Sequence, residues 1–162
     1  MVIGGQAVLL HGEPRLTRDI DVTLGVDSSR LAKVQKTVAT IGLSSPVNDV
    51  EQFVRTTNVF PVVDHPTGIR IDLIFSFTSY ETGAIRRAVG VNFGDVTVRF
   101  ASVEDLLVHK FVAGRPRDIE DVRGILARNR SVDEGYIHHW LKSFSDVVHR
   151  DLVMEFTALK KD

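Results

Sequence analysis

The chain contains no cysteine, which excludes both a disulfide framework and a metal site built from thiolates. It also lacks an excess of either charge, since 20 Lys and Arg residues stand against 21 Asp and Glu residues. A nucleic-acid partner would therefore have to be bound by a local basic patch. No apolar run is long enough to span a membrane, and the N-terminus lacks the charged region and long apolar core of a secretion signal. These absences favour a cytoplasmic protein with no membrane partner.

Length and composition are those of one globular domain. The 162 residues fall within the usual size of a single domain and are enough to bury a core. Hydrophobic residues make up 43% of the chain and charged residues 25%, as is ordinary for a soluble protein. We therefore look for function in local motifs and not in overall composition.

Two aspartates near the N-terminus, Asp19 and Asp21, are spaced i, i+2. In a β-strand such residues project from the same face, while Ile20 and Val22 project from the other. Two carboxylates on one rigid face repel each other unless a cation lies between them or a proton is shared. Oxygen ligands of this kind suit Mg²⁺. Alone, the same spacing also fits the solvent side of an edge strand, so its weight depends on its neighbours.

The neighbouring feature is a pair of glycines, Gly4 and Gly5. If residues 1–3 form a strand and residues 6–11 continue as a helix, the glycines form the bend between them. Bare backbone N–H groups at a helix N-terminus can hold an anion. A phosphate at the glycines would then lie beside a metal at the aspartates.

The combination of GG with the later run RLTRDID, residues 15–21, resembles the nucleotidyltransferase superfamily that includes DNA polymerase β. It is most similar to the small bacterial branch related to the AbiEii and AbiGii toxins of toxin–antitoxin systems, over residues 4–121. The resemblance implies an α+β fold, in which a mixed β-sheet core of the polymerase β type is flanked by helices and followed by a C-terminal helical segment. We accordingly expect a catalytic core at 1–101 and a helical segment at 102–162, packed together as one compact domain.

A third carboxylate, Asp72, lies in the stretch Ile69–Phe77, which alternates as a strand does. Asp72 falls on the less apolar face of that strand, where a buried carboxylate without a partner would be costly. By resemblance, Asp72 is the third metal-binding carboxylate, which joins Asp19 and Asp21 around Mg²⁺ or Mn²⁺. It is also the best candidate to accept the proton of an attacking hydroxyl.

Lys110 lies on the apolar stripe of a helix that we expect to begin after a Ser102 cap. Its stem could simply lie along the core with the amine at the rim. The alternative, which we favour, is that the amine neutralises a nucleotide phosphate. Family members carry a lysine in this helix before a turn of the Gly-Arg-Pro type, as in KFVAGRPRDIEDV here. The resemblance adds Asp118 to the nucleotide-binding residues, although acids at such positions often only complement the helix dipole.

The remaining elements are predicted from periodicity, caps and turn residues. We expect strands at 15–26, 54–64, 69–77 and 95–100, helices at 31–41 and 82–89, a loop at 43–51, and helices from 102 to the end.

Together these features predict a metal-dependent nucleotidyltransferase that moves a nucleoside monophosphate from a nucleoside triphosphate (NTP) to RNA, tRNA above all, or to a protein. The resemblance also suggests a toxin controlled by an antitoxin protein. An alternative is a non-catalytic module that binds nucleotide or a partner, although such a module has no need for clustered acids. A metal-dependent nuclease would leave the glycines and Lys110 without a purpose. The expected roles are catalysis for Asp19, Asp21, Asp72 and Lys110, metal binding for the same three aspartates, and nucleotide binding for Gly4, Gly5, Arg15, Thr17, Lys110 and Asp118.

Overall fold

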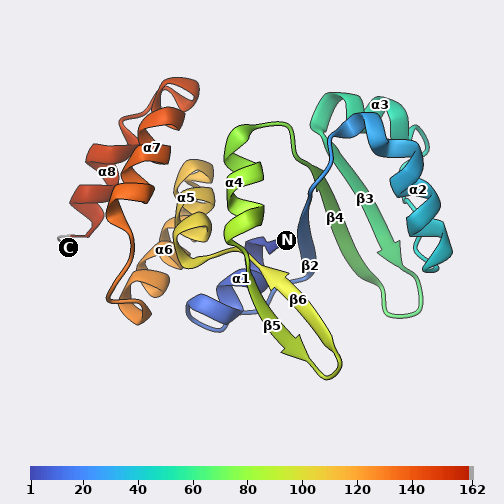
Figure 1. Ribbon diagram of the computed structural model, residues 1–162, viewed down its shortest axis with the longest axis horizontal. Coiled ribbons are helices and arrows are strands. Elements are labelled where there is room, and N and C mark those ends of the chain that lie inside the picture. The colour runs from blue at the N-terminus through green and yellow to red at the C-terminus, as the bar shows by residue number, and fades with distance from the viewer. Residues whose placement is uncertain (161–162) are drawn as a thin grey trace.

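The computed structural model describes residues 1–160, and its centre is a six-stranded mixed sheet with the order β3-β4-β2-β1-β6-β5 (Figure 1). The predicted C-terminal segment ends at 162, so its last two residues lie outside the described range. The strands are β1 (Val2–Ile3), β2 (Asp19–Leu24), β3 (Val59–Asp64), β4 (Ile69–Phe75), β5 (Val89–Phe93) and β6 (Val96–Phe100). The helices are α1 (Gly4–His11), α2 (Leu31–Thr40), preceded by the 3-10 turn η1 (Ser28–Arg30), α3 (Val50–Thr57), α4 (Ser79–Arg87), α5 (Val103–Ala113), α6 (Pro116–Arg128), α7 (Glu134–Val148) and α8 (Leu152–Leu159).

This arrangement confirms the predicted fold class. A mixed sheet is flanked by helices, and the chain then continues through α5 to α8 as a purely helical stretch. In Figure 1, α5 to α8 stand on one side of the sheet and α2 and α3 on the other.

The pairing of β2 with β4 sets the geometry of the site. The two strands are parallel neighbours, and their register places Asp21 opposite Asp72 and Asp19 opposite Arg70. Paired residues on adjacent strands project from the same side of a sheet. Asp19, Asp21 and Asp72 therefore share one side, which we call the carboxylate face.

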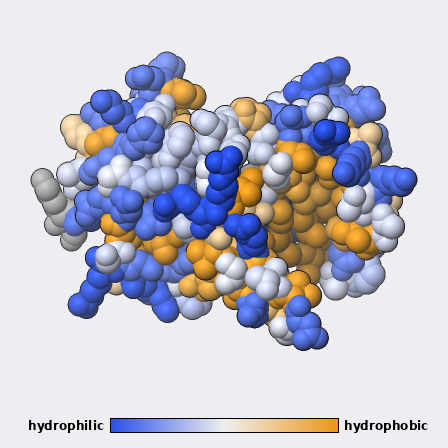
Figure 2. Space-filling model, viewed as in Figure 1, coloured by the Kyte–Doolittle hydropathy of each residue, from blue (hydrophilic) through white to orange (hydrophobic). Residues whose placement is uncertain are grey.

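The opposite side of the same strands is apolar and packs on α2 and α3. Phe60, Val62 and Phe75 are almost completely buried there, in one cluster with side chains of both helices. Each such side chain contributes about 1.5–3 kcal/mol when fully buried. Ile71 and Leu73 are only half-buried at the edge of this cluster, and Figure 2 shows apolar surface over β4 and its neighbours. Because the apolar side chains of these strands pack on α2 and α3, the aspartates project from the opposite side of the sheet.

Helix α5 is the central element of the helical side. Leu106, Leu107 and Phe111 are buried in the larger core cluster, which joins α1 to the C-terminal helices. As predicted, Ser102 caps the helix, since its side chain accepts a hydrogen bond from the backbone N–H of Asp105. A helix so fully enclosed holds its side chains in fixed positions. Within residues 1–160, no helix is long and apolar enough to cross a membrane.

One predicted boundary is wrong between β2 and β3. The stretch expected to be a loop at 43–51 and a strand from 54 instead contains α3, and β3 begins only at Val59. Asp49 caps α3 by accepting from the N–H of Gln52, and Asn58 ends it in the left-handed conformation, with φ of 56°. The β-branched content of this stretch favours a strand, but the caps and the burial of Val54 against the sheet decide for a helix.

Other predicted boundaries also shift. The helix expected at 82–89 runs over α4, and Val89 instead opens β5, a strand that periodicity did not reveal. Strand β2 begins at Asp19 and not at 15, so that residues 15–18 lie outside the β-ladder. The segment before β2 is therefore free to bring Arg15 and Thr17 against other elements.

Candidate active site

The residues given roles from the sequence all line one pocket, of about 390 Å³. They come from β1–α1, the segment before β2, β2 itself, β4, α5 and α6. The structure thus brings together residues that are up to about a hundred positions apart. The pocket is lined by Gly4, Gly5, Arg15, Thr17, Asp19, Asp21, Asp72, Lys110 and Asp118, together with Arg115 and Arg117.

The glycine corner lies in direct contact with the carboxylate face. Gly4 has φ of 61°, and a Cβ added there would lie 1.8 Å from Oδ2 of Asp21. A Cβ on Gly5 would lie 2.4 Å from Oγ1 of Thr17. Helix α1 starts here without a side-chain cap, so its first N–H groups remain available to an anion. A phosphate bound at this end would lie beside Asp21.

Gly4→Ala is expected to destabilise the protein and to displace the Asp21 carboxylate. A left-handed conformation costs an L-residue roughly 1–2 kcal/mol, and the 1.8 Å approach to Asp21 adds a steric clash. Gly68→Ala is the matched control, because Gly68 has φ of 72° and nothing within 4 Å of its would-be Cβ. Urea denaturation should show a larger loss of stability for Gly4→Ala than for Gly68→Ala. Equal losses would mean that Asp21 does not pack against the corner.

The charge of Asp21 on this face is only partly compensated by its surroundings. Burial raises the pKa of Asp21 above 3.8, and the charges of Asp19 and Asp72 raise it further, while Lys110 and Arg115 act in the opposite direction. Thr17 donates to Oδ1 of Asp19 at 3.2 Å. A cation placed between the carboxylates would relieve this repulsion.

These residues fit a hard divalent cation in their chemistry. Within residues 1–160, no group of three or more His, Asp or Glu side chains is placed to hold a metal ion, so Asp19, Asp21 and Asp72 do not form a ready three-carboxylate site. Mg²⁺ does not require one, because it usually takes one or two carboxylates and completes its shell with phosphate oxygens and water. Burial, followed by the charges of Asp19 and Asp72, raises the pKa of Asp21, and a bound cation would oppose this shift.

Asp21→Asn is expected to raise the free energy of unfolding at pH 7 in the absence of divalent metal. Because the pKa of Asp21 is higher in the folded protein, its ionisation as the pH rises above 3.8 costs stability, and Asn removes that cost. Below the folded pKa the carboxyl is neutral, so the difference between variant and wild type should shrink. Urea denaturation at pH 7 and at acidic pH measures it. Asp27→Asn should lower the free energy of unfolding at pH 7, since hydrogen bonds from Ser29 lower the pKa of Asp27. A loss of stability at pH 7 in Asp21→Asn as well as in Asp27→Asn would contradict the assignment.

A chain of alternating charges runs along the other side of the pocket. Nζ of Lys110 lies 2.8 Å from Oδ1 of Asp118 and 2.9 Å from Oδ2 of Asp121. Arg15 binds Asp121 through two hydrogen bonds, of 2.8 and 3.0 Å, and Arg115 binds Asp118. The Lys110, Asp118 and Asp121 side chains are at most 7% exposed. We call these five residues the charge chain.

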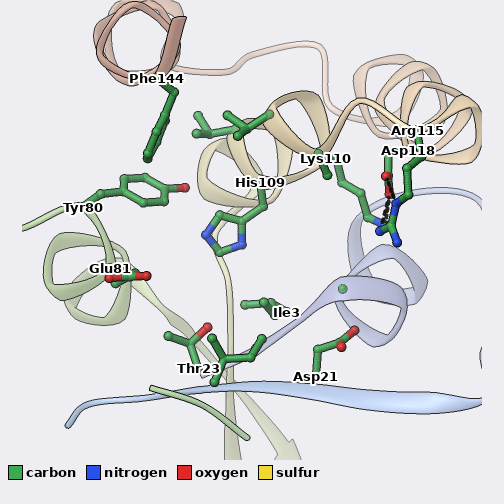
Figure 3. A pocket seen from close by; sticks show the side chains of 15 residues that line it. Ile3, Asp21, Thr23, Tyr80, Glu81, His109, Lys110, Arg115, Asp118 and Phe144 are labelled. Carbon is green, nitrogen blue, oxygen red and sulfur yellow. Dashed lines mark hydrogen bonds and ion pairs between the residues drawn. The ribbon is translucent and has the colours of Figure 1, made fainter. Parts of the chain in front are cut away.

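The charge chain places three cations in the same pocket as the carboxylate face. Burial alone would raise the pKa of Asp118 and of Asp121, but hydrogen bonds from Arg115, Arg15 and Lys110 outweigh it and lower both pKa values. Figure 3 shows Lys110 and Arg115 joined to Asp118 across the pocket from Asp21. The two aspartates are thus firmly ionised and hold the cations in place. An anion that binds together with a metal cation would fit between the carboxylate face and the charge chain.

The sequence did not single out two further cations of the pocket, Arg115 and Arg117. They lie at the start of α6, in the GRPR turn, and Arg115 is close enough to Asp21 to affect the pKa of that carboxyl. The GRPR turn was the sequence feature from which these arginines could have been predicted. Arginines near a helix N-terminus can bind the same anion as a neighbouring glycine corner.

A comparison with protein-family models identifies the family of this chain. A model of the family described as "Nucleotidyltransferase of unknown function (DUF6036)" matches residues 1–161. Among curated proteins, none matches the sequence.

Two solved structures align with this chain. ANT(2")-Ia, determined in complex with adenylyl-2"-tobramycin, aligns with a TM-score of 0.57 at 17% identity, over 90% of this chain and 86% of its own. An antigenic nucleotidyltransferase-like protein from Paracoccidioides brasiliensis aligns with a TM-score of 0.48 at 17% identity, over 78% of this chain. The chain spans 65% of the length of that second protein. The first of these supports the fold assignment.

The sheet, the carboxylate face beside a glycine corner and the match along nearly the whole sequence lead to one assignment: this chain belongs to the nucleotidyltransferase family DUF6036.

Proposed function

We propose that this protein transfers a nucleoside monophosphate from an NTP to RNA, with tRNA as the preferred acceptor class, or to a protein side chain. The observation that carries this proposal is the parallel register that pairs Asp21 with Asp72 beside the Gly4 corner. It aligns carboxylates from two strands on one face, with phosphate-binding donors next to them. Nucleotidyl transfer depends on positioning and on charge stabilisation, which are the properties that such a face provides.

The metal would be held by Asp19, Asp21 and Asp72. Mg²⁺ or Mn²⁺ bound there neutralises phosphate charge and makes the acceptor hydroxyl easier to deprotonate. The half-buried Asp21 needs such a partner most, because its charge is opposed by burial and by both neighbouring carboxylates.

The chain's own groups would then position the triphosphate. The N–H groups at the start of α1, the Thr17 hydroxyl and the cations Lys110, Arg15 and Arg115 all line the pocket. The cations of the charge chain act as a fixed positive wall, since their partners Asp118 and Asp121 prevent them from turning away.

The reaction itself needs one bond formed and one broken. An acceptor oxygen attacks the α-phosphorus and forms the new P–O bond. The bond between the α-phosphorus and the oxygen that bridges to the β-phosphate breaks, and pyrophosphate leaves with the electron pair of that bond. Asp72 is the group that accepts the acceptor's proton, directly or through a water molecule. Its position on β4, opposite Asp21, supports this role.

The sequence resemblance to the AbiEii branch supports a biological role as a toxin restrained by an antitoxin. Expression of the wild-type chain should then arrest growth, and a co-encoded partner should relieve the arrest. Normal growth at high expression would separate the enzyme activity from the toxin role.

The test of the activity is a labelling experiment. Purified protein is incubated with Mg²⁺, each of the four labelled triphosphates in turn, and either total RNA or RNA-free cell extract. We expect label in RNA or in protein from at least one triphosphate. Binding of triphosphate without labelling of either acceptor would favour the alternative of a non-catalytic nucleotide-binding module.

A further inference from the structure

A second pocket, of about 420 Å³, opens directly beside the first. The two pockets share Gly4, Asp21, Lys110, Arg115 and Asp118. A single ligand can therefore extend from one into the other. The volume is in the range of small-molecule sites, which run from about 300 to 1,000 Å³.

The second pocket differs from the first in chemistry. Away from the shared charged residues its walls are apolar and aromatic, with side chains from β1, β2 and β4 on one side and from α5 on the other. Tyr80 makes edge contacts with the rings of His109 and Phe144, with centroid distances of 5.3 and 5.2 Å. Figure 3 shows these rings around the hollow and the imidazole of His109 directed into it. Burial lowers the pKa of His109, so the ring is neutral at pH 7 and the walls favour a flat, uncharged ligand.

The walls include several hydrogen-bond acceptors, namely the Thr23 hydroxyl, the His109 imidazole and the carboxylate of Glu81. Glu81 uses Oε2 to accept from the N–H groups of Phe77 and Thr78 and from the Thr78 hydroxyl, which completes the capping box of α4. Within residues 1–160 its Oε1 forms no hydrogen bond, and Glu81 lines the second pocket. A carboxylate oxygen can only accept, so it selects a ligand that carries N–H or O–H donors.

We propose that the second pocket receives the nucleobase of the NTP, and that Glu81 favours a base with an exocyclic amino group. This inference rests on the proposed function. An NTP has a charged triphosphate at one end and a flat aromatic base at the other, and the two joined pockets have the same division. Apolar walls with aromatic rings bind any base by stacking, whereas a highly charged acceptor would lose its hydration there without compensation.

The test is a substitution at the rim of the second pocket that fills the pocket with a larger side chain. Ala113 is exposed, ends α5 and lines the second pocket but not the first, so Ala113→Trp places an indole in the proposed base site. Calorimetry would measure the binding of ATP and of inorganic tripolyphosphate, both with Mg²⁺. We expect the affinity for ATP to fall about tenfold or more, because base stacking is lost, and the affinity for tripolyphosphate to stay unchanged.

Controls separate the pocket from the fold. Ala158→Trp adds the same indole to an exposed position on α8 that lines neither pocket, and it should leave both affinities unchanged. Ala113→Leu is a milder filling variant that should weaken ATP binding less. Unchanged ATP binding in Ala113→Trp, with tripolyphosphate still bound, would overturn the base site alone. A wild-type protein that binds neither compound would overturn the proposed function as well.

Base selection has its own readout. The wild-type protein should bind ATP or CTP about tenfold more tightly than UTP, because Glu81 can accept from the exocyclic amino group of adenine or cytosine but would face the O4 acceptor of uracil. Glu81→Gln can still complete the capping box, but its amide can present a donor and should narrow this difference. Equal binding of UTP by the wild type would refute the role of Glu81.

Discussion

Asp19→Ala combined with Asp21→Ala should abolish labelling, with a loss of at least about 1,000-fold, while the protein remains folded. The loss follows because the two carboxylates on β2 supply most of the negative charge that would hold the metal. Stability should not fall, since the pKa of Asp21 is raised and its charge therefore opposes folding at pH 7. The measurements are the labelling assay and thermal unfolding of the same preparations.

Two single variants make this result specific. Asp72→Asn changes the carboxylate face from the neighbouring strand and should also remove labelling, because Asp72 pairs with Asp21 across the sheet. Asp95→Ala removes an exposed carboxylate in the turn between β5 and β6 and should leave labelling intact. Labelling that survives the double change on β2 would exclude this face as the catalytic site. A large drop in the unfolding midpoint of the double variant would instead contradict the electrostatic reasoning.

Lys110→Met should cause the largest loss of stability, about 3 kcal/mol, or roughly 6–12 °C in the unfolding midpoint. The change removes the cation that lies between Asp118 and Asp121, and both carboxylates are at least nine-tenths buried. The value lies at the low end of the usual range for a broken buried pair, because Arg115 and Arg15 still hold one aspartate each. Lys142→Met, at an exposed position on α7, should change stability by less than about 0.5 kcal/mol.

The triple variant Lys110→Met, Asp118→Asn and Asp121→Asn separates structure from chemistry. With the uncompensated carboxylates gone, much of the lost stability should return. Labelling should remain absent, because the triphosphate still lacks its central cation. A triple variant that is stable and labels normally would show that Lys110 is only a structural residue.

The two sides of the site divide the electrostatic requirements of phosphate transfer. The carboxylate face carries negative charge that is only partly compensated at Asp21, and the charge chain carries cations that are paired with their own aspartates. Neither side can move its charges easily, since the aspartates are positioned by the register of the sheet and Lys110 and Arg15 by ion pairs with buried aspartates. A triphosphate bound with its metal would complement both sides without rearrangement of the protein.

Local pattern was enough to predict much of the fold. The i, i+2 spacing of Asp19 and Asp21, the alternation around Asp72 and the cap at Ser102 all depend on residues close in sequence, and each appears where it was expected. The errors fall where tertiary packing overrides such patterns. Helix α3 replaces an expected strand because Val54 is buried against the sheet, and β5 exists because it pairs with β6.

The charge chain marks the limit of prediction for the site. Lys110 and Asp118 were assigned to nucleotide binding, but nothing local shows that Lys110 lies between two aspartates, or that Arg15 reaches Asp121, which is 106 residues away in the chain. The role of Arg115 likewise appears only when α6 is placed beside β2.

The sequence by itself determined which faces carry carboxylates, where glycines permit a close turn, and that a lysine sits among apolar neighbours, because these follow from the 2.0 and 3.6 residue periods and from backbone sterics. Only the tertiary structure decided that the two acidic strands are adjacent and in register, and which cations face them. Strand order and long-range ion pairs are set by the packing of the whole chain, in which each contact depends on many residues that are distant in sequence.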